Sequence, residues 1–205
     1  MGEYKITRLH RGNYKTTEWS GGTTTELSIA PEGAVYADRD FEWRLSSATV
    51  EVEESNFTPL PDYNRIIMTL KGGIRLSHNG GEWLTLPEFT THSFDGGDET
   101  VSVGKVIDFN LMLRKGVCGG AVIPYALKDG EEVRTDRDLQ AEAPNYSTVM
   151  FYCYEGTALV VLVDGKETLI GRGETLKLTG DLKNIPLSCR ASFDTRVIAA
   201  AVRRL

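Results

Sequence analysis

Histidine is scarce in this sequence, which has only His10, His78 and His92 among its 205 residues. A histidine metal site in a small β-barrel needs two histidines at positions i and i+2 of one strand, a carboxylate a few residues later and another histidine from a later strand. Because side chains alternate along a strand, that spacing points every ligand into the barrel. No two of the three histidines lie within two residues of each other. We therefore expect neither a metal nor another cofactor.

Cysteine is equally scarce, and long apolar segments are missing. Cys118, Cys153 and Cys189 form no C-x-x-C pair, so we expect buried, reduced thiols of a cytoplasmic protein. The first residues, Met1 to Thr7, lack the apolar core of a signal peptide. No apolar run approaches the roughly 20 residues that cross a bilayer. These absences predict a cytoplasmic location and no membrane partner.

Positive charge is in the minority, because 23 lysines and arginines stand against 29 acidic residues, for a formal net charge of -6. A nucleic acid would be repelled on average and is not an expected partner. Motifs for covalent and phosphate chemistry are also missing. No G-x-S-x-G elbow occurs. The segment Trp19–Glu26 has a glycine pair but neither the lysine of a P-loop nor a helical pattern after it.

Helical periodicity is nearly absent, and alternation with a period of two takes its place. From Ile107 to Arg114, apolar residues occupy every second position, as in a strand with two different faces. After Phe41 the apolar phase shifts at Ser46-Ser47, which predicts a β-bulge there. The 21 glycines are spread along the chain and recur in turn pairs such as Asp164-Gly165, a pattern typical of many short strands. The predicted fold class is all-β, with two antiparallel barrels of the jelly-roll type.

A weak internal repeat supports two related lobes. Leu70-Lys-Gly72 aligns with Tyr154-Glu-Gly156, and Gly97-Asp98 aligns with Gly180-Asp181, in the same order and at nearly the same offset. Repeated landmarks of this kind indicate a duplicated unit.

The repeat predicts three parts of the chain. Residues 1–124 form an N-terminal lobe and residues 148–205 a C-terminal lobe, with terminal strands free to cross between them. Residues 125–147 are polar and acidic without clear alternation, which predicts a linker with a short helix near Asp136–Ala143.

Polar residues occupy one face of several predicted strands. The residues concerned are Asp108, Asn110 and Arg114 on one strand, Arg44 and Ser46 on a second, and Thr24 and Glu26 on a third. One interpretation is the solvated face of an antiparallel sheet. The other is a pocket lining, because the inner face of a barrel is polar where it binds a ligand, and arginines on rigid strands suit planar carboxylates. Trp19, beside a glycine pair, either packs in a core or roofs such a pocket.

Four segments in a fixed order resemble the HutD/Ves family of small bacterial proteins. They are Trp19–Glu26, Phe41–Val50, Phe57–Arg65, and Phe94–Asp98 followed by Asp108–Arg114. The resemblance implies a metal-free double cupin (bicupin) with a polar pocket in the N-terminal lobe. One departure is Asp62-Tyr-Asn-Arg65, where the family usually has Gly-x-Asp-Arg. Asn64 would then offer a ligand an amide acceptor without charge, which bears on ligand identity.

The resemblance also implies a role for the protein. Some members are encoded with enzymes of histidine utilisation, and a regulatory role through binding of a pathway intermediate is suggested for them, whereas others are linked to cold or stress responses. Our favoured hypothesis is a non-enzymatic protein that binds a small anionic, carboxylate-bearing metabolite. Arg44, Arg65 and Arg114 would hold its acidic groups. The expected ligand-binding residues are Trp19, Thr24, Glu26, Arg44, Ser46, Arg65, Asp108, Asn110 and Arg114.

Two other classes of function stay open. A metal-free isomerase or hydrolase would use Glu26 or Asp108 as a general base, since carboxylates beside arginines have shifted pKa values. An assembly protein would use the C-terminal lobe as a docking surface, with the apolar run Thr157–Val163 pairing across a homodimer, although a buried core strand is the preferred interpretation of this run. Turnover of a bound ligand separates an enzyme from a binder, and a strict monomer would exclude the dimer.

Overall fold

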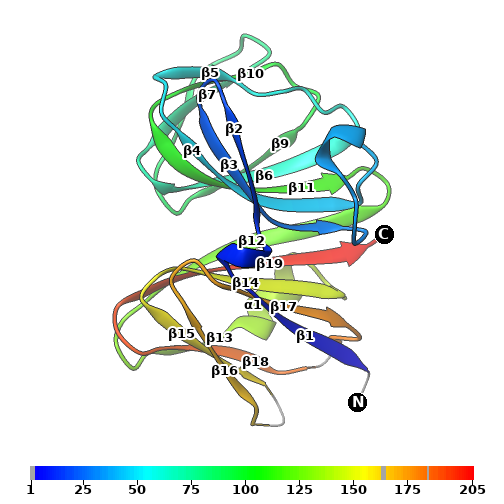
Figure 1. Ribbon diagram of the computed structural model, residues 1–205, viewed down its shortest axis with the longest axis vertical. Coiled ribbons are helices and arrows are strands. Elements are labelled where there is room, and N and C mark those ends of the chain that lie inside the picture. The colour runs from blue at the N-terminus through cyan, green and yellow to red at the C-terminus, as the bar shows by residue number, and fades with distance from the viewer. Residues whose placement is uncertain (1–2, 163–164, 184) are drawn as a thin grey trace. The chain divides into compact units, whose positions relative to one another are not determined.

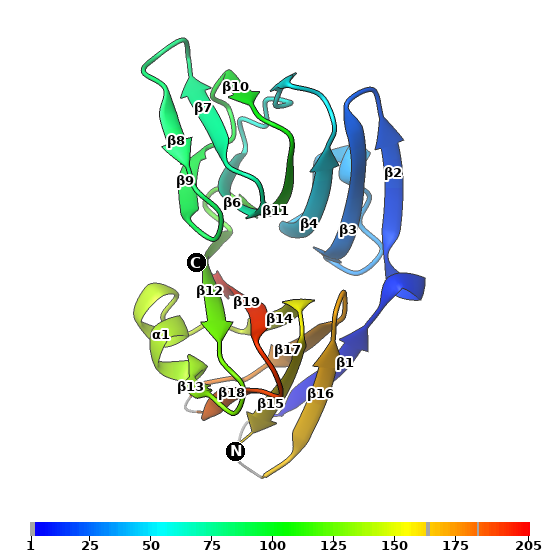
Figure 2. The same ribbon diagram turned by 90° about the vertical axis from the view of Figure 1, so that its left-hand side faces the viewer.

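The computed structural model describes residues 3–162, 165–183 and 185–205. These residues form nineteen β-strands, two short 3-10 helices and one α-helix, which confirms the predicted all-β class. The chain divides into two compact units (Figure 1 and Figure 2). Residues 14–118 form the first, here called the N-lobe. The second, the C-lobe, comprises residues 119–205 together with the N-terminal segment up to Asn13.

The N-lobe consists of two antiparallel sheets. Its elements are β2 (Lys15–Trp19), β3 (Gly22–Ala30), the 3-10 helix η2 (Tyr36–Asp38), β4 (Trp43–Val50), β5 (Glu54–Asn56), β6 (Tyr63–Lys71), β7 (Ile74–His78), β8 (Leu84–Leu86), β9 (Thr91–Asp95), β10 (Thr100–Val103) and β11 (Val106–Arg114). The larger sheet has the order β2-β3-β4-β11-β6-β9, and the smaller has the order β5-β10-β7-β8. Buried Ile67, Leu76 and Val106 belong to one core cluster of this lobe.

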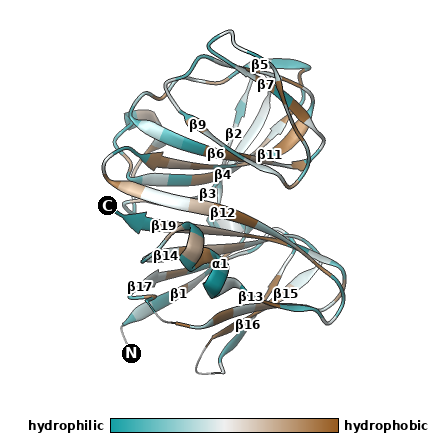
Figure 3. Ribbon diagram, turned by 180° about the vertical axis from the view of Figure 1, so that it is seen from behind, coloured by the Kyte–Doolittle hydropathy of each residue, from teal (hydrophilic) through white to brown (hydrophobic). Residues whose placement is uncertain are grey.

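The C-lobe is built in the same way. Its elements are β1 (Tyr4–Leu9), the 3-10 helix η1 (Arg11–Asn13), β12 (Cys118–Leu127), β13 (Glu132–Arg134), α1 (Thr135–Glu142), β14 (Thr148–Glu155), β15 (Thr157–Leu162), β16 (Glu167–Gly171), β17 (Thr175–Gly180), β18 (Leu187–Ala191) and β19 (Thr195–Arg204). The sheet orders are β1-β17-β14-β19-β12 and β13-β18-β15-β16. Many of the strands contain hydrophobic residues, whereas the loops are mostly hydrophilic (Figure 3). Among the described residues, no helix is long and apolar enough to cross a membrane.

Both lobes repeat one strand topology, which supports a duplication. The order β4-β11-β6-β9 in the N-lobe corresponds to β12-β19-β14-β17 in the C-lobe, and β5-β10-β7-β8 corresponds to β13-β18-β15-β16. Each larger sheet also has a register shift at the same point, before Asp108 in β11 and before Val197 in β19. Aligning the two shifts makes Asp108 equivalent to Val197 and Arg65 equivalent to Val149.

Two turn glycines of the sequence repeat occupy equivalent sites. Gly72 directly follows β6 and Gly156 directly follows β14, the strands that pair with β11 and β19 across the two register shifts. Their φ angles are 80° and 76°. A Cβ on Gly72 would lie 2.7 Å from the carbonyl oxygen of Lys105, and a Cβ on Gly156 would lie 2.6 Å from that of Asp194. Because Lys105 and Asp194 each precede the last strand of their repeat, both turns require glycine for its conformation and for its lack of a side chain.

Gly156→Ala is expected to destabilise the C-lobe by about 3 kcal/mol, against about 1 kcal/mol for Gly130→Ala. The φ angles of the two glycines are 76° and 74°, so both variants have the same left-handed strain. A Cβ on Gly130 meets nothing within 4 Å, so only Gly156→Ala adds a clash. Chemical denaturation followed by circular dichroism measures both losses. Equal losses would contradict the steric argument.

The segment of residues 125–147, expected as a linker, is part of the C-lobe. It contains the end of β12, then β13 and α1, and α1 lies within one residue of the predicted helix. Leu139 and Ala143 are fully buried in the C-lobe core, which anchors this otherwise polar stretch. At the other end of the chain, β1 pairs with β17 over its whole length, as Figure 1 shows. The units therefore divide near residues 13 and 118, whereas the sequence placed the first boundary at 124.

The apolar run Thr157–Val163, for which a buried core strand was preferred over a dimer contact, forms an inner strand. Its described part is β15, which pairs with β16 on one side and with β18 on the other. Val163 and Asp164 lie outside the described residues. Ala158, Val160 and Leu162 are buried in the C-lobe core. Because both edges of β15 are hydrogen-bonded within the lobe, this strand has no edge to offer a second chain.

Candidate functional site

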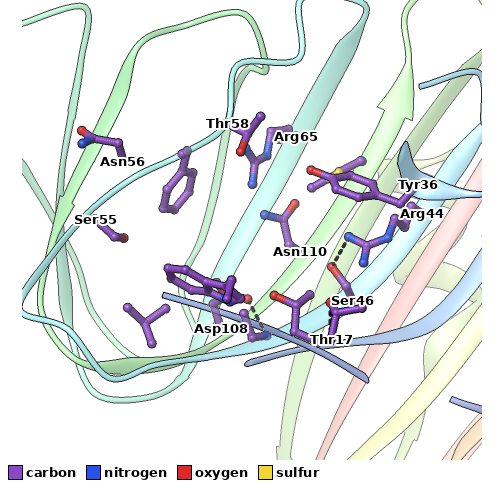
Figure 4. Close-up of a pocket in the computed structure, with 16 residues that line it drawn as sticks. Thr17, Tyr36, Arg44, Ser46, Ser55, Asn56, Thr58, Arg65, Asp108 and Asn110 are labelled. Atoms are coloured by element: carbon purple, nitrogen blue, oxygen red, sulfur yellow. Dashed lines mark hydrogen bonds between the residues drawn. The ribbon is translucent and has the colours of Figure 1, made fainter. Parts of the chain in front are cut away.

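The N-lobe contains a cavity of about 310 Å³ lined mainly by residues of its larger sheet. Sixteen side chains line it (Figure 4). Seven of the nine expected binding residues are among them, namely Trp19, Thr24, Arg44, Ser46, Arg65, Asp108 and Asn110. All of these except Trp19 and Thr24 are buried. A solvated sheet face would expose them, so the structure favours the pocket interpretation of these polar residues.

Arg44 projects from β4 and is held by three neighbours. Its Nε donates a hydrogen bond to Glu26 Oε2 over 2.7 Å, and its Nη1 donates to Ser46 Oγ over 3.2 Å. The guanidinium lies 4.3 Å from the ring centroid of Tyr36. The charge of Arg44 is therefore balanced by Glu26 within the lobe.

Arg65, from β6, is the cation of the cavity lining that has no carboxylate partner among the described residues. Its guanidinium lies against two rings that contact each other, 4.8 Å from the centroid of Phe57 and 5.2 Å from that of Phe94. Only 6% of the residue is exposed, and its buried Nε has no hydrogen-bond partner in the described chain. Burial lowers the pKa of Arg65 to about 10, against the raising effects of Tyr36 and Asp108. Arg65 therefore stays charged at neutral pH with an N–H group free to donate.

Asp108, from β11, is the buried carboxyl group of the cavity. Its Oδ1 accepts a hydrogen bond from the Ala48 N–H over 3.0 Å, and its backbone oxygen accepts one from Ser47 Oγ. Burial raises the pKa of Asp108 to about 6, although the Ala48 N–H, Arg65 and Arg44 act in the opposite direction. Near neutral pH, Asp108 is thus close to the point at which it gains a proton.

The bulge predicted in β4 lies instead in the neighbouring strand. β4 keeps one register against β11 along its whole length, and the shift occurs in β3 between Glu26 and Ser28. Arg44, Ser46, Ala48 and Val50 consequently all line the same cavity. The phase change in the sequence therefore reflects a single cavity-facing side of β4, which is polar at Arg44 and Ser46 and apolar at Ala48 and Val50.

The remaining wall gives the cavity a mixed character. Asn110 lies on the same face of β11 as Asp108, and its buried Oδ1 has no hydrogen-bond partner among the described residues. Val50, Phe57 and Met112 add apolar surface. Trp19 lines the cavity from β2, a strand whose residues are all exposed, and is itself 40% exposed. The expected roof position of Trp19 is consistent with this placement.

The two other expected ligand contacts, Glu26 and Arg114, lie elsewhere, as does Asn64. Glu26 does not line the cavity and reaches it only through Arg44. Arg114 lies at the end of β11, where its Nη1 donates to the Asp40 carbonyl oxygen over 2.6 Å. Asn64, which replaces the family aspartate, is exposed, because it alternates with the buried Arg65 along β6. The substitution at Asn64 therefore does not change the cavity wall.

Sequence reasoning missed nine lining residues, which are Thr17, Tyr36, Ala48, Val50, Ser55, Asn56, Phe57, Thr58 and Met112. Alternation alone placed Met112 on the face of Asp108 and Asn110, so that residue was recoverable. Tyr36 belongs to a short 3-10 helix between strands, where no periodic pattern exists to place it.

Two of the three scattered histidines meet in the structure. The Nε2 atoms of His78 and His92 lie 2.9 Å apart, and His78 Nδ1 lies 2.8 Å from Thr100 Oγ1. Burial lowers the pKa of both rings. Phe94 contacts both histidines and also faces Arg65. Within the described ranges, no three His, Cys, Asp or Glu side chains are grouped as a metal site requires.

The sequence matches the HutD family model over residues 11–197. The chain belongs to the HutD family. The match spans both lobes, beyond the N-terminal segments that carry the sequence resemblance, and the family name refers to histidine utilisation. No curated protein matches this HutD-family chain.

Solved structures share the fold of this HutD-family protein. A conserved protein of unknown function from Pseudomonas aeruginosa is 21% identical with a TM-score of 0.79, over 97% of this chain and 98% of that one. HutD from Pseudomonas fluorescens is 19% identical with a TM-score of 0.74, over 98% and 100%. The nickel(II) complex of the pirin YhhW from Escherichia coli is 10% identical with a TM-score of 0.67, over 96% and 98%. These similarities establish the fold, and the predicted bicupin is confirmed.

Proposed function

We propose that this HutD-family protein binds a small carboxylate-bearing metabolite in the N-lobe cavity, without converting it, and has a regulatory or stress-related role connected with histidine utilisation. The observation that supports the proposal most strongly is the buried Arg65, whose Nε has no partner within the described chain. The family name supports the connection with histidine utilisation.

An unpaired buried guanidinium is costly, because the hydration it loses is not replaced. The rings of Phe57 and Phe94 replace part of it, at about 0.5–2 kcal/mol for a cation–π contact. A carboxylate would supply a direct ion-pair partner and accept two parallel N–H donors in the geometry that a guanidinium favours. Arg44 needs no such ligand, because Glu26 already neutralises it.

The size of the cavity limits the metabolite. At about 310 Å³, it lies at the lower end of the range for ligand pockets, about 300–1,000 Å³. The apolar wall of Val50, Phe57 and Met112 suits a compact carbon skeleton, while Arg65 and Asn110 suit its polar end. A small organic acid satisfies both requirements.

Small carboxylates should therefore stabilise the protein against heat, and their neutral amides should not. We expect a shift with benzoate, succinate or malate, and none with benzamide or succinamide, at equal ionic strength. A ligand at 100 times its Kd stabilises the folded state by about 2.7 kcal/mol, which differential scanning fluorimetry resolves. Equal shifts with acids and amides, or none with any acid, would contradict the proposal.

A metal-free enzyme is the second candidate, because of Asp108. This carboxyl group lines the cavity and burial raises its pKa to about 6, which suits a general base near neutral pH. Mass spectrometry of a stabilising acid after long incubation with the protein separates the two functions. An unchanged acid supports the binder, and a stoichiometric excess of product supports the enzyme.

A further inference from the structure

The charges around the cavity are balanced before a ligand enters. Arg44 from β4 is paired with Glu26 from β3. That pairing leaves one cation and one carboxyl group, Arg65 from β6 and Asp108 from β11, which are 6% and 7% exposed. The structure shows no ion pair between these two. Tyr36 is the other titratable residue of the lining.

A carboxylate that binds Arg65 upsets this balance. It neutralises the arginine and places a second negative charge in a cavity that already contains Asp108. Two carboxylates that share a buried site rarely stay ionised together, because each raises the pKa of the other. Protonation of Asp108 removes the repulsion, and Oδ1 of the neutral acid can still accept the Ala48 N–H.

We propose that the cavity takes up its carboxylate ligand together with one proton, which Asp108 holds. This inference rests on the proposed function and adds that ligand binding is coupled to pH. The geometry supports it, because Asp108 is buried and lines the cavity, and within the described part of the chain its carboxyl group has only the backbone N–H of Ala48 as a hydrogen-bond partner. The pKa of about 6 in the free protein places the coupling near neutral pH.

The sign of the effect follows from linkage. The protonated protein is the form that binds an anion well, so affinity is highest below the free pKa of Asp108. Affinity then falls as the pH rises toward the higher pKa of the complex, and levels off above it. Benzoate, whose own pKa of about 4 keeps it ionised, is expected to bind about tenfold more tightly at pH 5.5 than at pH 8.

Calorimetry of wild-type protein with benzoate and with succinate, in two buffers of different ionisation enthalpy at pH 7, counts the protons directly. We expect uptake of about half to one proton per ligand. Asp108→Asn keeps an acceptor for the Ala48 N–H and should bind with little dependence on pH, at pH 8 about as tightly as the wild type at pH 5.5. Asp62→Asn removes an exposed carboxylate of the same lobe and should behave as the wild type.

The outcomes separate this inference from the proposed function. Binding without proton uptake, and with equal affinity at both pH values, overturns the proton coupling and leaves carboxylate binding intact. A pH dependence that persists in Asp108→Asn also overturns it and assigns the coupling to the histidine pair, His78 and His92. Absence of binding by benzoate and succinate at every pH overturns both proposals.

Discussion

Arg65→Met is expected to weaken carboxylate binding by about 100-fold or more while making the free protein more stable. Loss of a buried, hydrogen-bonded charge partner costs about 2–5 kcal/mol of binding free energy. In the free protein the same change removes a buried cation that forms no ion pair with any described residue, and its replacement by an apolar side chain of similar length stabilises the fold by about 1 kcal/mol or more. Opposite effects on binding and on stability distinguish a ligand-binding arginine from a structural one.

The measurements for Arg65→Met are direct. Calorimetry with benzoate gives the loss of affinity, and urea unfolding gives the stability. All three tryptophans, Trp19, Trp43 and Trp83, lie in the N-lobe, so intrinsic fluorescence reports the unfolding of that lobe. Arg114→Met is the matched control, because Arg114 lies on the next β-strand outside the cavity. A destabilised Arg65→Met protein that binds benzoate normally would refute the assignment.

Glu26→Ala is expected to destabilise the N-lobe by about 3 kcal/mol, because it leaves the guanidinium of Arg44 buried without a partner. The side chains of Arg44 and Glu26 are 6% and 16% exposed, and their N···O distance is 2.7 Å. The double variant Glu26→Ala with Arg44→Met should recover most of the loss, since neither charge then remains. Tryptophan fluorescence during urea unfolding measures each variant.

An exposed ion pair provides the comparison for Glu26→Ala. Lys128 and Asp194 in the C-lobe have the same N···O distance of 2.7 Å, but their side chains are 80% and 68% exposed. Asp194→Ala should leave the stability unchanged within error, because water screens such pairs. A large loss in both variants would mean that distance, and not burial, determines the contribution of these pairs.

Alternation made the fold and much of the site predictable. The period of two placed Asp108, Asn110 and Arg44 on strand faces, and the structure brings these faces to one cavity. Alternation does not show where along a face the cavity ends, which is why Arg114, two residues beyond Met112, was misplaced. It also does not show which charges pair with each other, so Glu26 was expected at the ligand when it holds Arg44 instead.

Contacts between strands that are distant in the chain could not be predicted from the sequence. His78 and His92 are separated by a hairpin and showed no spacing pattern, yet their rings share a hydrogen bond. The sequence allowed terminal strands to cross between the lobes without showing which strand does so, and β1 pairs with β17 of the C-lobe. Pairing of this kind depends on sheet topology, and a single sequence carries no local signal for it.

The equivalent positions of the two lobes differ in chemistry. Asp108, Asn110 and Arg65 correspond to Val197, Ala199 and Val149 by the shared register shift, and all three C-lobe residues are fully buried in its apolar core. The N-lobe has buried polar groups at positions where the C-lobe has aliphatic packing. Under the proposed function, selection on the first copy follows ligand chemistry while selection on the second follows packing, so the N-lobe can acquire new specificities without loss of the folded chain.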